Sequence, residues 1–265
     1  MSVEPGAGQV WEQGDVYDGY MGRWSRLVAA GFVDWLGVAD GSRWLDVGCG
    51  TGQLSSRILE RARPAALACV DPSGSFVETA RMRLGDRADC RVADAANLPF
   101  EDDSFDAVVS GLVLNFVPDV AAAVAEQARV TRGLVGAYVW DYAEGMQMLK
   151  LFWDEAAAVD PSAAELDEGA RFPIAREDAL RDAFGTAGLQ DVESRAIEVP
   201  TVFKDFDDLW KPFLGGQGPA GALAVGLGQE PREELRERLR ARVPVGADGS
   251  IALSARAWAV KGSAA

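Results

Sequence analysis

A short apolar run that leads into three closely spaced glycines is the feature that most restricts the fold of this chain. The segment reads Trp44-Leu45-Asp46-Val47-Gly48-Cys49-Gly50-Thr51-Gly52-Gln53-Leu54. It predicts a buried strand, a tight loop and the first turn of a helix. Because glycine has no Cβ, such a loop can press its backbone N–H groups against a ligand at the start of the helix.

Short apolar strands alternate with helices after this loop. We expect strands at residues 43–47, 66–70, 90–92, 105–110 and 134–140, and helices at 53–63, 73–84 and 119–132. Near-continuous apolar strands that alternate with helices are typical of a parallel sheet covered on both faces.

The flanking regions follow other patterns. The first 40 residues predict a helix with an apolar stripe. After residue 141 we expect helices at 144–160, 176–187 and 233–242 and strands at 192–203 and 250–261. Residues 161–173 are acidic and predict a loop, whereas residues 206–228 are rich in glycine and aromatics and predict neither helix nor strand.

The loop chemistry separates the possible ligands. A dinucleotide-binding fingerprint requires glycine at position 53, where this chain has Gln53. A P-loop requires lysine, and the segment has none. Asp46 would repel a diphosphate at the strand end, but it would attract a ligand that carries ammonium and sulfonium groups.

From Asp46 to Gly52 the loop resembles the first motif of the class I S-adenosylmethionine-dependent methyltransferases. The resemblance extends over residues 17–142 and is closest to the branch that includes the ubiquinone and menaquinone biosynthesis methyltransferases. It implies a Rossmann-like sheet of seven mostly parallel strands with helices on both faces and an antiparallel last strand. It also implies a helical cap over the carboxyl ends of the strands.

This fold would occupy residues 1–265 as one domain. Residues 1–40 would form an N-terminal lid, residues 41–142 the cofactor-binding core and residues 143–190 a cap insertion. Residues 191–265 would supply the last strands, with a second insertion at 204–232.

The resemblance also assigns cofactor contacts. Asp71 ends the second strand about 20 residues after the glycines, where a carboxylate can bind both ribose hydroxyls; it could equally cap the following helix. Asp94 would bind the adenine amino group, and Tyr20 and Arg23 of the lid would face the cofactor carboxylate. The full expected set is Tyr20, Arg23, Asp46, Gly48, Cys49, Gly50, Gln53, Leu54, Asp71, Pro72, Asp94, Ala95, Gly111 and Leu112.

The methyl acceptor would bind where the fifth strand ends. Asp141 and Tyr142 are the candidate catalytic residues at this edge, with Asp141 the candidate base. The expected acceptor pocket consists of Trp140, Met146, Phe152, Trp153, Trp210 and Phe213. The alternative is that these apolar side chains form an ordinary helical core.

Composition excludes several other functions. The net charge of −15 disfavours nucleic acid and anionic membranes as partners, and the arginines of 232–242 alternate with glutamates as on an exposed, charge-paired helix. The chain has no histidine, which excludes Ser-His-Asp and Cys-His catalysis. Three dispersed cysteines support neither disulfides nor a zinc site, so we expect no metal.

The sequence therefore predicts an enzyme that transfers the sulfonium methyl of S-adenosylmethionine to an oxygen, nitrogen or carbon nucleophile. The acceptor would be a small molecule such as a secondary metabolite or a quinone-like ring, and S-adenosylhomocysteine the second product. With no signal peptide or long apolar run, we expect a cytoplasmic protein. The alternatives are a protein of this fold that binds the cofactor without methylating and, disfavoured by Gln53, a nicotinamide-dependent oxidoreductase.

Overall fold

The described residues fall into two compact units. The computed structural model describes residues 22–264, so Tyr20 lies outside the described part. One unit, here called the sheet unit, comprises residues 25–139, 174–197 and 257–264. The other, here called the helical unit, comprises residues 22–24, 140–173 and 198–256.

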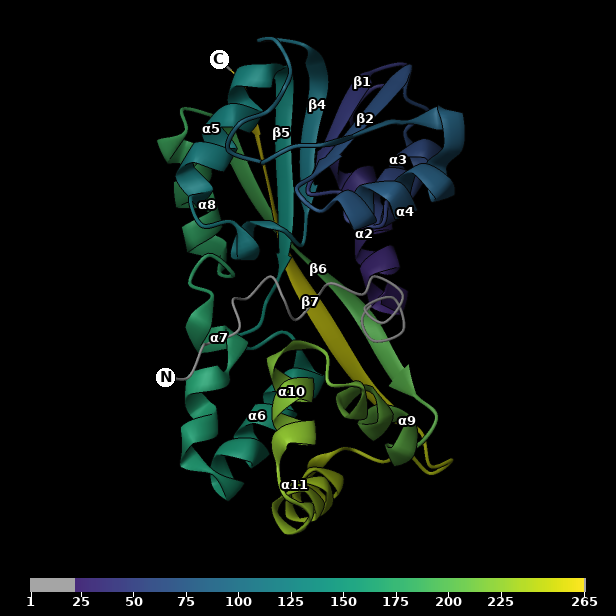
Figure 1. The fold of residues 1–265 in the computed structure, drawn as a ribbon, viewed down its shortest axis with the longest axis vertical. Coiled ribbons are helices and arrows are strands. Elements are labelled where there is room, and N and C mark those ends of the chain that lie inside the picture. Colours follow the sequence, from purple (N-terminus) through teal and green to yellow (C-terminus); the bar gives the residue numbers. More distant parts are fainter. Residues whose placement is uncertain (1–21, 265) are drawn as a thin grey trace. The chain divides into compact units, whose positions relative to one another are not determined.

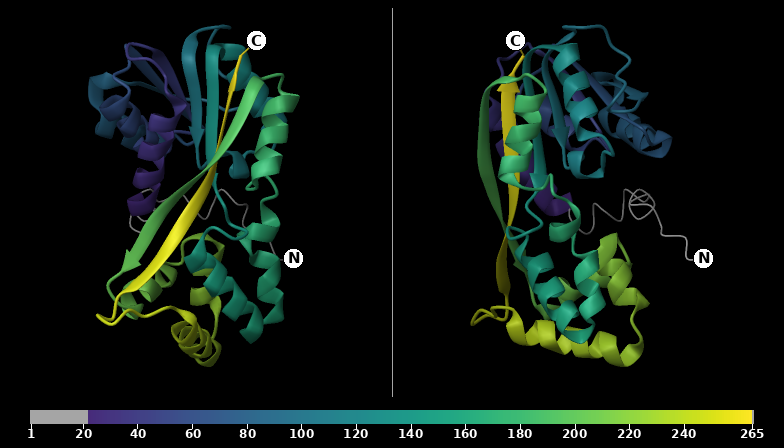
Figure 2. Two further views of the ribbon diagram at one scale, coloured as in Figure 1. Left: turned by 180° about the vertical axis from the view of Figure 1, so that it is seen from behind. Right: turned by 90° about the vertical axis from the view of Figure 1, so that its left-hand side faces the viewer.

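Seven strands form one sheet, in the order β3-β2-β1-β4-β5-β7-β6. Strands β1 to β5 pair in parallel, and the sheet is mixed because it also contains one antiparallel pair. Both views of Figure 2 show β6 and β7 side by side. The strands are β1 (Arg43–Val47), β2 (Ala66–Asp71), β3 (Asp89–Val92), β4 (Phe105–Gly111), β5 (Thr131–Trp140), β6 (Gln190–Phe203) and β7 (Ile251–Ser263). The expected mixed, Rossmann-like sheet is confirmed.

Helices flank this sheet and bury its apolar strands. In Figure 1, α3 and α4 lie together beside β1 and β2, and α5 lies beside α8. The longer helices associated with the sheet unit are α2 (Arg23–Leu36, which begins in the helical unit), α3 (Gln53–Arg61), α4 (Gly74–Leu84), α5 (Val120–Val130) and α8 (Glu177–Thr186). The short turns η3 (Gly85–Arg87) and η4 (Leu114–Phe116) complete it. Leu45, Val70 and Val108 are fully buried in its core, as the apolar strands predict.

Two expected helix ends are wrong by two residues. Helix α3 stops at Arg61 because Arg63 adopts a positive φ of 42° just before Pro64. Helix α5 stops at Val130 because Thr131 already belongs to β5: it pairs with Phe105, and its hydroxyl donates to the Phe105 carbonyl at 3.2 Å. A β-branched residue favours that extended position.

The helical unit is built around α6 (Gln147–Val159), which lies beside α10 (Gly218–Gly226) and α11 (Gln229–Arg242) in Figure 1. The rings of Phe152 and Phe213 stack at its centre with centroids 4.4 Å apart. The remaining short elements are η5 (Pro161–Leu166), α7 (Glu168–Arg171), α9 (Phe206–Trp210) and η6 (Lys211–Gly215). Among residues 22–264, no helix is long and apolar enough to cross a membrane.

The expectation that residues 206–228 lack regular structure is wrong, because α9, η6 and α10 occupy them. Asp205 caps α9 by accepting the Asp208 N–H at 2.9 Å, and Pro219 lies in the first turn of α10, where its missing N–H costs no hydrogen bond. Gly221 packs so closely that a Cβ would lie 2.9 Å from the Gly216 backbone. Residues 161–173 likewise form η5 and α7 where a loop was expected.

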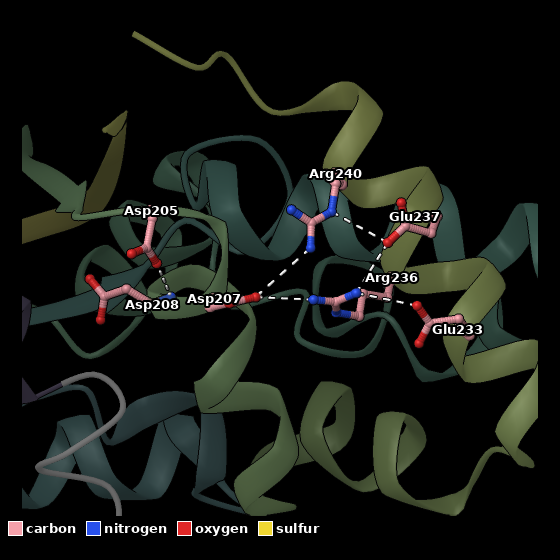
Figure 3. Close-up of polar contacts among 7 residues, drawn as sticks. All are labelled: Asp205, Asp207, Asp208, Glu233, Arg236, Glu237 and Arg240. Atoms are coloured by element: carbon pink, nitrogen blue, oxygen red, sulfur yellow. Dashed lines mark hydrogen bonds and ion pairs between the residues drawn. The ribbon is translucent and has the colours of Figure 1, made fainter. Parts of the chain in front are cut away.

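The charged helix α11 pairs its arginines with acids (Figure 3). Arg236 donates to Asp207 of α9 at 3.0 Å and also contacts Glu233 and Glu237 of its own helix. Arg240 contacts Glu237 at 3.3 Å. The expected charge-paired helix is present. The ion pair between Arg236 and Asp207 also connects α11 to α9 within the helical unit.

Candidate functional site

The glycine loop of the sheet unit has an unusual backbone conformation. Gly48, Gly50 and Gly52 have positive φ angles of 74°, 52° and 83°, which L-residues rarely adopt. A Cβ on Gly48 would lie 2.5 Å from the Val113 side chain, so the loop after β4 closes against it. Among residues 22–264, a Cβ on Gly50 would meet no atom within 4 Å, so these residues leave the loop open to a ligand at that point.

Backbone hydrogen bonds hold the loop in place. The N–H groups of Gly48 and Cys49 both donate to the Val70 carbonyl, at 2.8 and 2.9 Å. The Gly52 N–H donates to the Cys49 carbonyl at 2.8 Å, and Arg83 of α4 donates to the Thr51 hydroxyl at 3.1 Å. These bonds fix the loop before a ligand arrives, which lowers the entropy lost on binding.

Asp46 is a buried carboxylate with one unused oxygen. It is 1% exposed, and its Oδ2 accepts the Ser55 hydroxyl at 2.6 Å. Its Oδ1 has no hydrogen-bond partner among the described residues. Burial raises the pKa of Asp46 to about 7, the Ser55 hydrogen bond opposes that shift, and the nearby Asp71 carboxylate adds to it. A buried oxygen without a donor is costly, so this site suits a ligand that brings an N–H group or a positive charge.

Asp71 holds the other side of the loop. Its Oδ2 accepts the Gly50 N–H and its Oδ1 the Ser73 N–H, both at 2.9 Å. Burial raises its pKa, and these two N–H groups oppose the shift. Ser73 is the residue that caps α4, by accepting the Phe76 N–H. Each Asp71 oxygen retains a lone pair for a ligand hydroxyl.

The other expected cofactor residues of the sheet unit lie at strand ends. Asp94 is exposed just after β3, and its Oδ1 accepts the Ala96 N–H at 2.8 Å, which forms a tight turn. Ala95 packs against the apolar core cluster. Leu112 follows β4 with a positive φ of 61° and donates its N–H to the Tyr138 carbonyl at 2.8 Å, while a Cβ on Gly111 would clash with the Tyr138 ring.

The remaining members of the expected set surround the loop. Leu54 and Cys49 are buried, Gln53 is half-buried and Pro72 is exposed beside Asp71. Ser55 and Val113 were missed by the sequence reasoning, although they contact Asp46 and Gly48. A hydroxyl residue in the first turn of the helix after the glycines was the available signal for Ser55.

Neither of the two expected lid contacts, Tyr20 and Arg23, is among the described residues of the sheet unit. Tyr20 lies outside the described residues. Arg23 belongs to the helical unit, where its guanidinium lies over the rings of Trp24 and Phe203, 4.7 and 5.0 Å from their centroids, and 3.9 Å from Asp208. Its role as a cofactor contact stays a prediction.

The expected acceptor residues all lie in the helical unit and are buried. Trp210 packs on Phe213 with ring centroids 5.8 Å apart, and Phe152 stacks on the same ring. The buried set is Trp140, Met146, Phe152, Trp153, Trp210 and Phe213. These contacts also fit the alternative that they form an ordinary core, and their role as an acceptor pocket stays a prediction.

Asp141 is held by other protein groups. Its Oδ2 accepts from the Arg256 guanidinium at 2.7 Å, and its Oδ1 accepts the Glu144 N–H at 3.1 Å. Tyr142 packs its ring against Phe172, with centroids 5.6 Å apart. The proposed catalytic roles of Asp141 and Tyr142 remain predictions, and the ion pair with Arg256 gives Asp141 a structural role in any case.

Comparison with known proteins finds a family match within the sheet unit. The methyltransferase domain family matches residues 45–134, which include the glycine loop, Asp71 and Asp94. The ubiquinone/menaquinone biosynthesis C-methyltransferase UbiE of Paracoccus denitrificans is 36% identical over 112 residues, 40% of this chain and 45% of that protein. A malonyl-[acyl-carrier protein] O-methyltransferase of Geobacter sulfurreducens is 41% identical over 91 residues, 34% of each chain. The chain thus spans less than half the length of these curated relatives.

Solved structures agree on the fold. The phosphoethanolamine N-methyltransferase 2 of Haemonchus contortus, solved with S-adenosyl-L-methionine, matches with a TM-score of 0.60 at 16% identity, over 99% of this chain and 60% of that one. The YcgJ protein of Bacillus subtilis matches with a TM-score of 0.57 at 17% identity, over 89% and 97% of the two chains. At these identities the likeness extends to the fold alone.

Proposed function

We propose that this chain, which belongs to the class I S-adenosylmethionine-dependent methyltransferases through residues 45–134, methylates a small molecule. The observation that carries the proposal is the pair of buried carboxylates on the glycine loop. Asp71 is organised by backbone N–H groups, and one oxygen of Asp46 has no hydrogen-bond partner in the described part of the chain. Neither a diphosphate nor a neutral ligand explains a second buried carboxylate there.

Each part of the site has a part of S-adenosylmethionine to hold. Asp71 would accept the two ribose hydroxyls, and the turn at Asp94 and Ala95 would border the adenine. Asp46 and the open backbone at Gly50 would face the methionine part of the cofactor. Its ammonium group would supply a positive charge next to the buried carboxylate of Asp46. Gly111 and Leu112 would form the neighbouring wall.

When bound, the cofactor supplies an electrophilic methyl group. The chain contributes position and alignment, which can account for roughly 7–11 kcal/mol of barrier reduction in such displacements. The acceptor would be an oxygen, nitrogen or carbon nucleophile of a metabolite or quinone-like ring, in line with the names of the curated relatives. Residues 174–190 of the expected cap insertion belong to the sheet unit, so we further propose that residues 143–173 and 204–232 form the acceptor-side cap of a single cytoplasmic enzyme that needs no metal.

Formation of S-adenosylhomocysteine tests the proposal. The purified protein is incubated with S-adenosylmethionine and a panel of phenols, amines, quinols and carboxylic acids. The proposal expects S-adenosylhomocysteine together with one acceptor that gains the mass of a methylene group. An Asp71→Ala variant at the same concentration is the matched control and, at a cofactor concentration that does not saturate it, should form both products more slowly. If the protein binds the cofactor but no panel member yields S-adenosylhomocysteine, the non-methylating alternative is favoured.

A further inference from the structure

The helical unit contains three buried carboxylates, and they differ in their partners. Asp141 pairs with Arg256 at 2.5 Å, and Glu155 pairs with Arg238 at 3.0 Å and with Arg242. Glu168 is 4% exposed and forms no ion pair with any residue in the described part of the chain. Among the described residues, one of the three buried acids therefore has no arginine or lysine within ion-pair distance, although the charge of Arg171 still acts on it.

Glu168 is nevertheless firmly placed. Its Oε2 accepts the indole N–H of Trp153 at 2.5 Å. The adjacent Gly169 packs so tightly that a Cβ would lie 2.9 Å from the Cα of Ala143 and 3.1 Å from the Tyr142 carbonyl. One helical turn later, the Phe172 ring packs at a tilt against the Tyr142 ring. The carboxylate thus lies where α6, α7 and the residues after β5 meet, on a segment rich in aromatic rings.

The buried negative charge of Glu168 is only partly stabilised by its protein neighbours. Burial raises the pKa of Glu168 to about 7, and its own backbone N–H, the hydrogen bond from Trp153 and the charge of Arg171 offset this only in part. A hydrogen bond from a cation stabilises a buried carboxylate more than a hydrogen bond from a neutral donor does. Aromatic rings also attract an ammonium group through their π faces. A protonated amine meets both conditions, whereas an alcohol or phenol supplies no charge.

We propose that Glu168 and the indole of Trp153 form a binding site for a protonated amine. This binding site does not depend on the proposed function. The site also explains why a carboxylate is buried here without an ion pair among the described residues.

Calorimetry with matched ligands tests the site directly. The full-length protein without cofactor is titrated at pH 8 with ethylammonium and benzylammonium, and with ethanol and benzyl alcohol as neutral counterparts. We expect at least one ammonium ion to bind at least about tenfold more tightly than its alcohol, which corresponds to about 1.4 kcal/mol. Equal binding of the charged and neutral members, or no ammonium binding, would overturn the proposal.

Substitutions then locate the charge. Glu168→Gln keeps an oxygen for the Trp153 N–H and removes the negative charge, so ammonium affinity should fall at least about tenfold while alcohol affinity stays unchanged. Glu165→Gln, at an exposed acid of η5, is the matched control and should keep wild-type affinity. Unchanged ammonium binding in Glu168→Gln would refute the site. If that variant does not fold, the wild-type comparison of ammonium with alcohol still decides.

Cofactor binding separates this proposal from the proposed function. S-adenosylmethionine is titrated into the same wild-type and Glu168→Gln samples. Ammonium binding without cofactor binding would keep the amine site and defeat the methyltransferase proposal. Cofactor binding without ammonium binding would defeat the amine site and keep the methyltransferase proposal.

Discussion

The two units place their buried acids in different ways. In the sheet unit, Asp46 and Asp71 lie at the carboxyl ends of parallel strands, and backbone N–H groups and the Ser55 hydroxyl supply their donors. In the helical unit, Asp141 and Glu155 are neutralised by arginine side chains. Backbone donors leave part of each carboxylate available to a ligand, whereas a guanidinium occupies it. A buried acid that forms no ion pair with an arginine or lysine is therefore the better candidate for binding a ligand. Among the described residues of the helical unit, Glu168 is such an acid.

Gly48→Ala should have the largest effect. Its methyl group would enter the space of Val113, in a backbone region unfavourable to L-residues, so the loop must move. We expect S-adenosylmethionine affinity to fall at least about 100-fold, measured by calorimetry. Gly41→Ala is the matched control, since Gly41 has a φ of 81° but open space around it. It should lose only about 1–2 kcal/mol of stability and keep the affinity. Equal affinities in the two variants would show that the close approach of Val113 is unimportant.

The pH dependence of Glu168 should come next. Its pKa is about 7 in the folded protein against an ordinary value of 4.5, so the folded state retains a proton that the unfolded chain releases. The contribution of Glu168 to the free energy of unfolding is therefore greatest below pH 4.5, falls by up to about 3 kcal/mol as the pH rises to 7, and is constant above. Urea unfolding of wild type and Glu168→Gln at pH 5 and 8 checks this. Relative to the wild type, the free energy of unfolding of the variant should be higher at pH 8 than at pH 5. An equal difference at both pH values would contradict the pKa assigned to Glu168.

Asp71→Ala should weaken cofactor binding by roughly 1.5–3 kcal/mol, the range of a charged hydrogen bond. Asp94→Ala should cost less, because Asp94 is exposed and screened by water. Calorimetry on both variants measures the difference. Equal losses would mean that burial does not distinguish the two carboxylates, and an unchanged affinity in Asp71→Ala would reduce Asp71 to an organiser of the loop.

Asp141→Asn should act mainly on the stability of the helical unit. It removes the charge that faces Arg256, whose side chain is 29% exposed, so we expect a loss of about 1–2 kcal/mol in the free energy of unfolding. Asp154→Asn, which breaks an exposed pair with Lys150, is the control and should cost less than about 0.5 kcal/mol. Turnover of the variant also bears on the predicted base: full turnover by a folded Asp141→Asn protein would remove that role.

The smallest effect is expected at the surface network of α11. Arg236→Ala should change the free energy of unfolding by no more than about 1 kcal/mol, because its partners Asp207, Glu233 and Glu237 are exposed. Most of that loss should vanish in 1 M salt. A loss that persists at high salt would instead point to the packing of Arg236 over the Phe206 ring.

The sequence predicted the sheet unit far better than the helical unit. Glycines at fixed spacing and apolar strands impose local geometry, so the parallel strands and the positions of Asp46 and Asp71 could be inferred, whereas the arrangement of all seven strands came from the resemblance. Residues 206–228 were wrongly expected to be irregular because their helices are short and depend on one cap, one proline and close glycine packing. Ser55 and Glu168 were not found, since their partners lie 9 and 15 residues away and only the fold joins them.

The central claim is that the sheet unit binds S-adenosylmethionine, and titration calorimetry of the wild-type protein tests it most directly. S-adenosylmethionine, S-adenosylhomocysteine and NAD are titrated separately into the full chain. The account predicts saturable binding of the first two and none of NAD. Binding of NAD, or of none of the three, would contradict the account, because the unpaired oxygen of Asp46 and the open loop at Gly50 would then serve some other ligand.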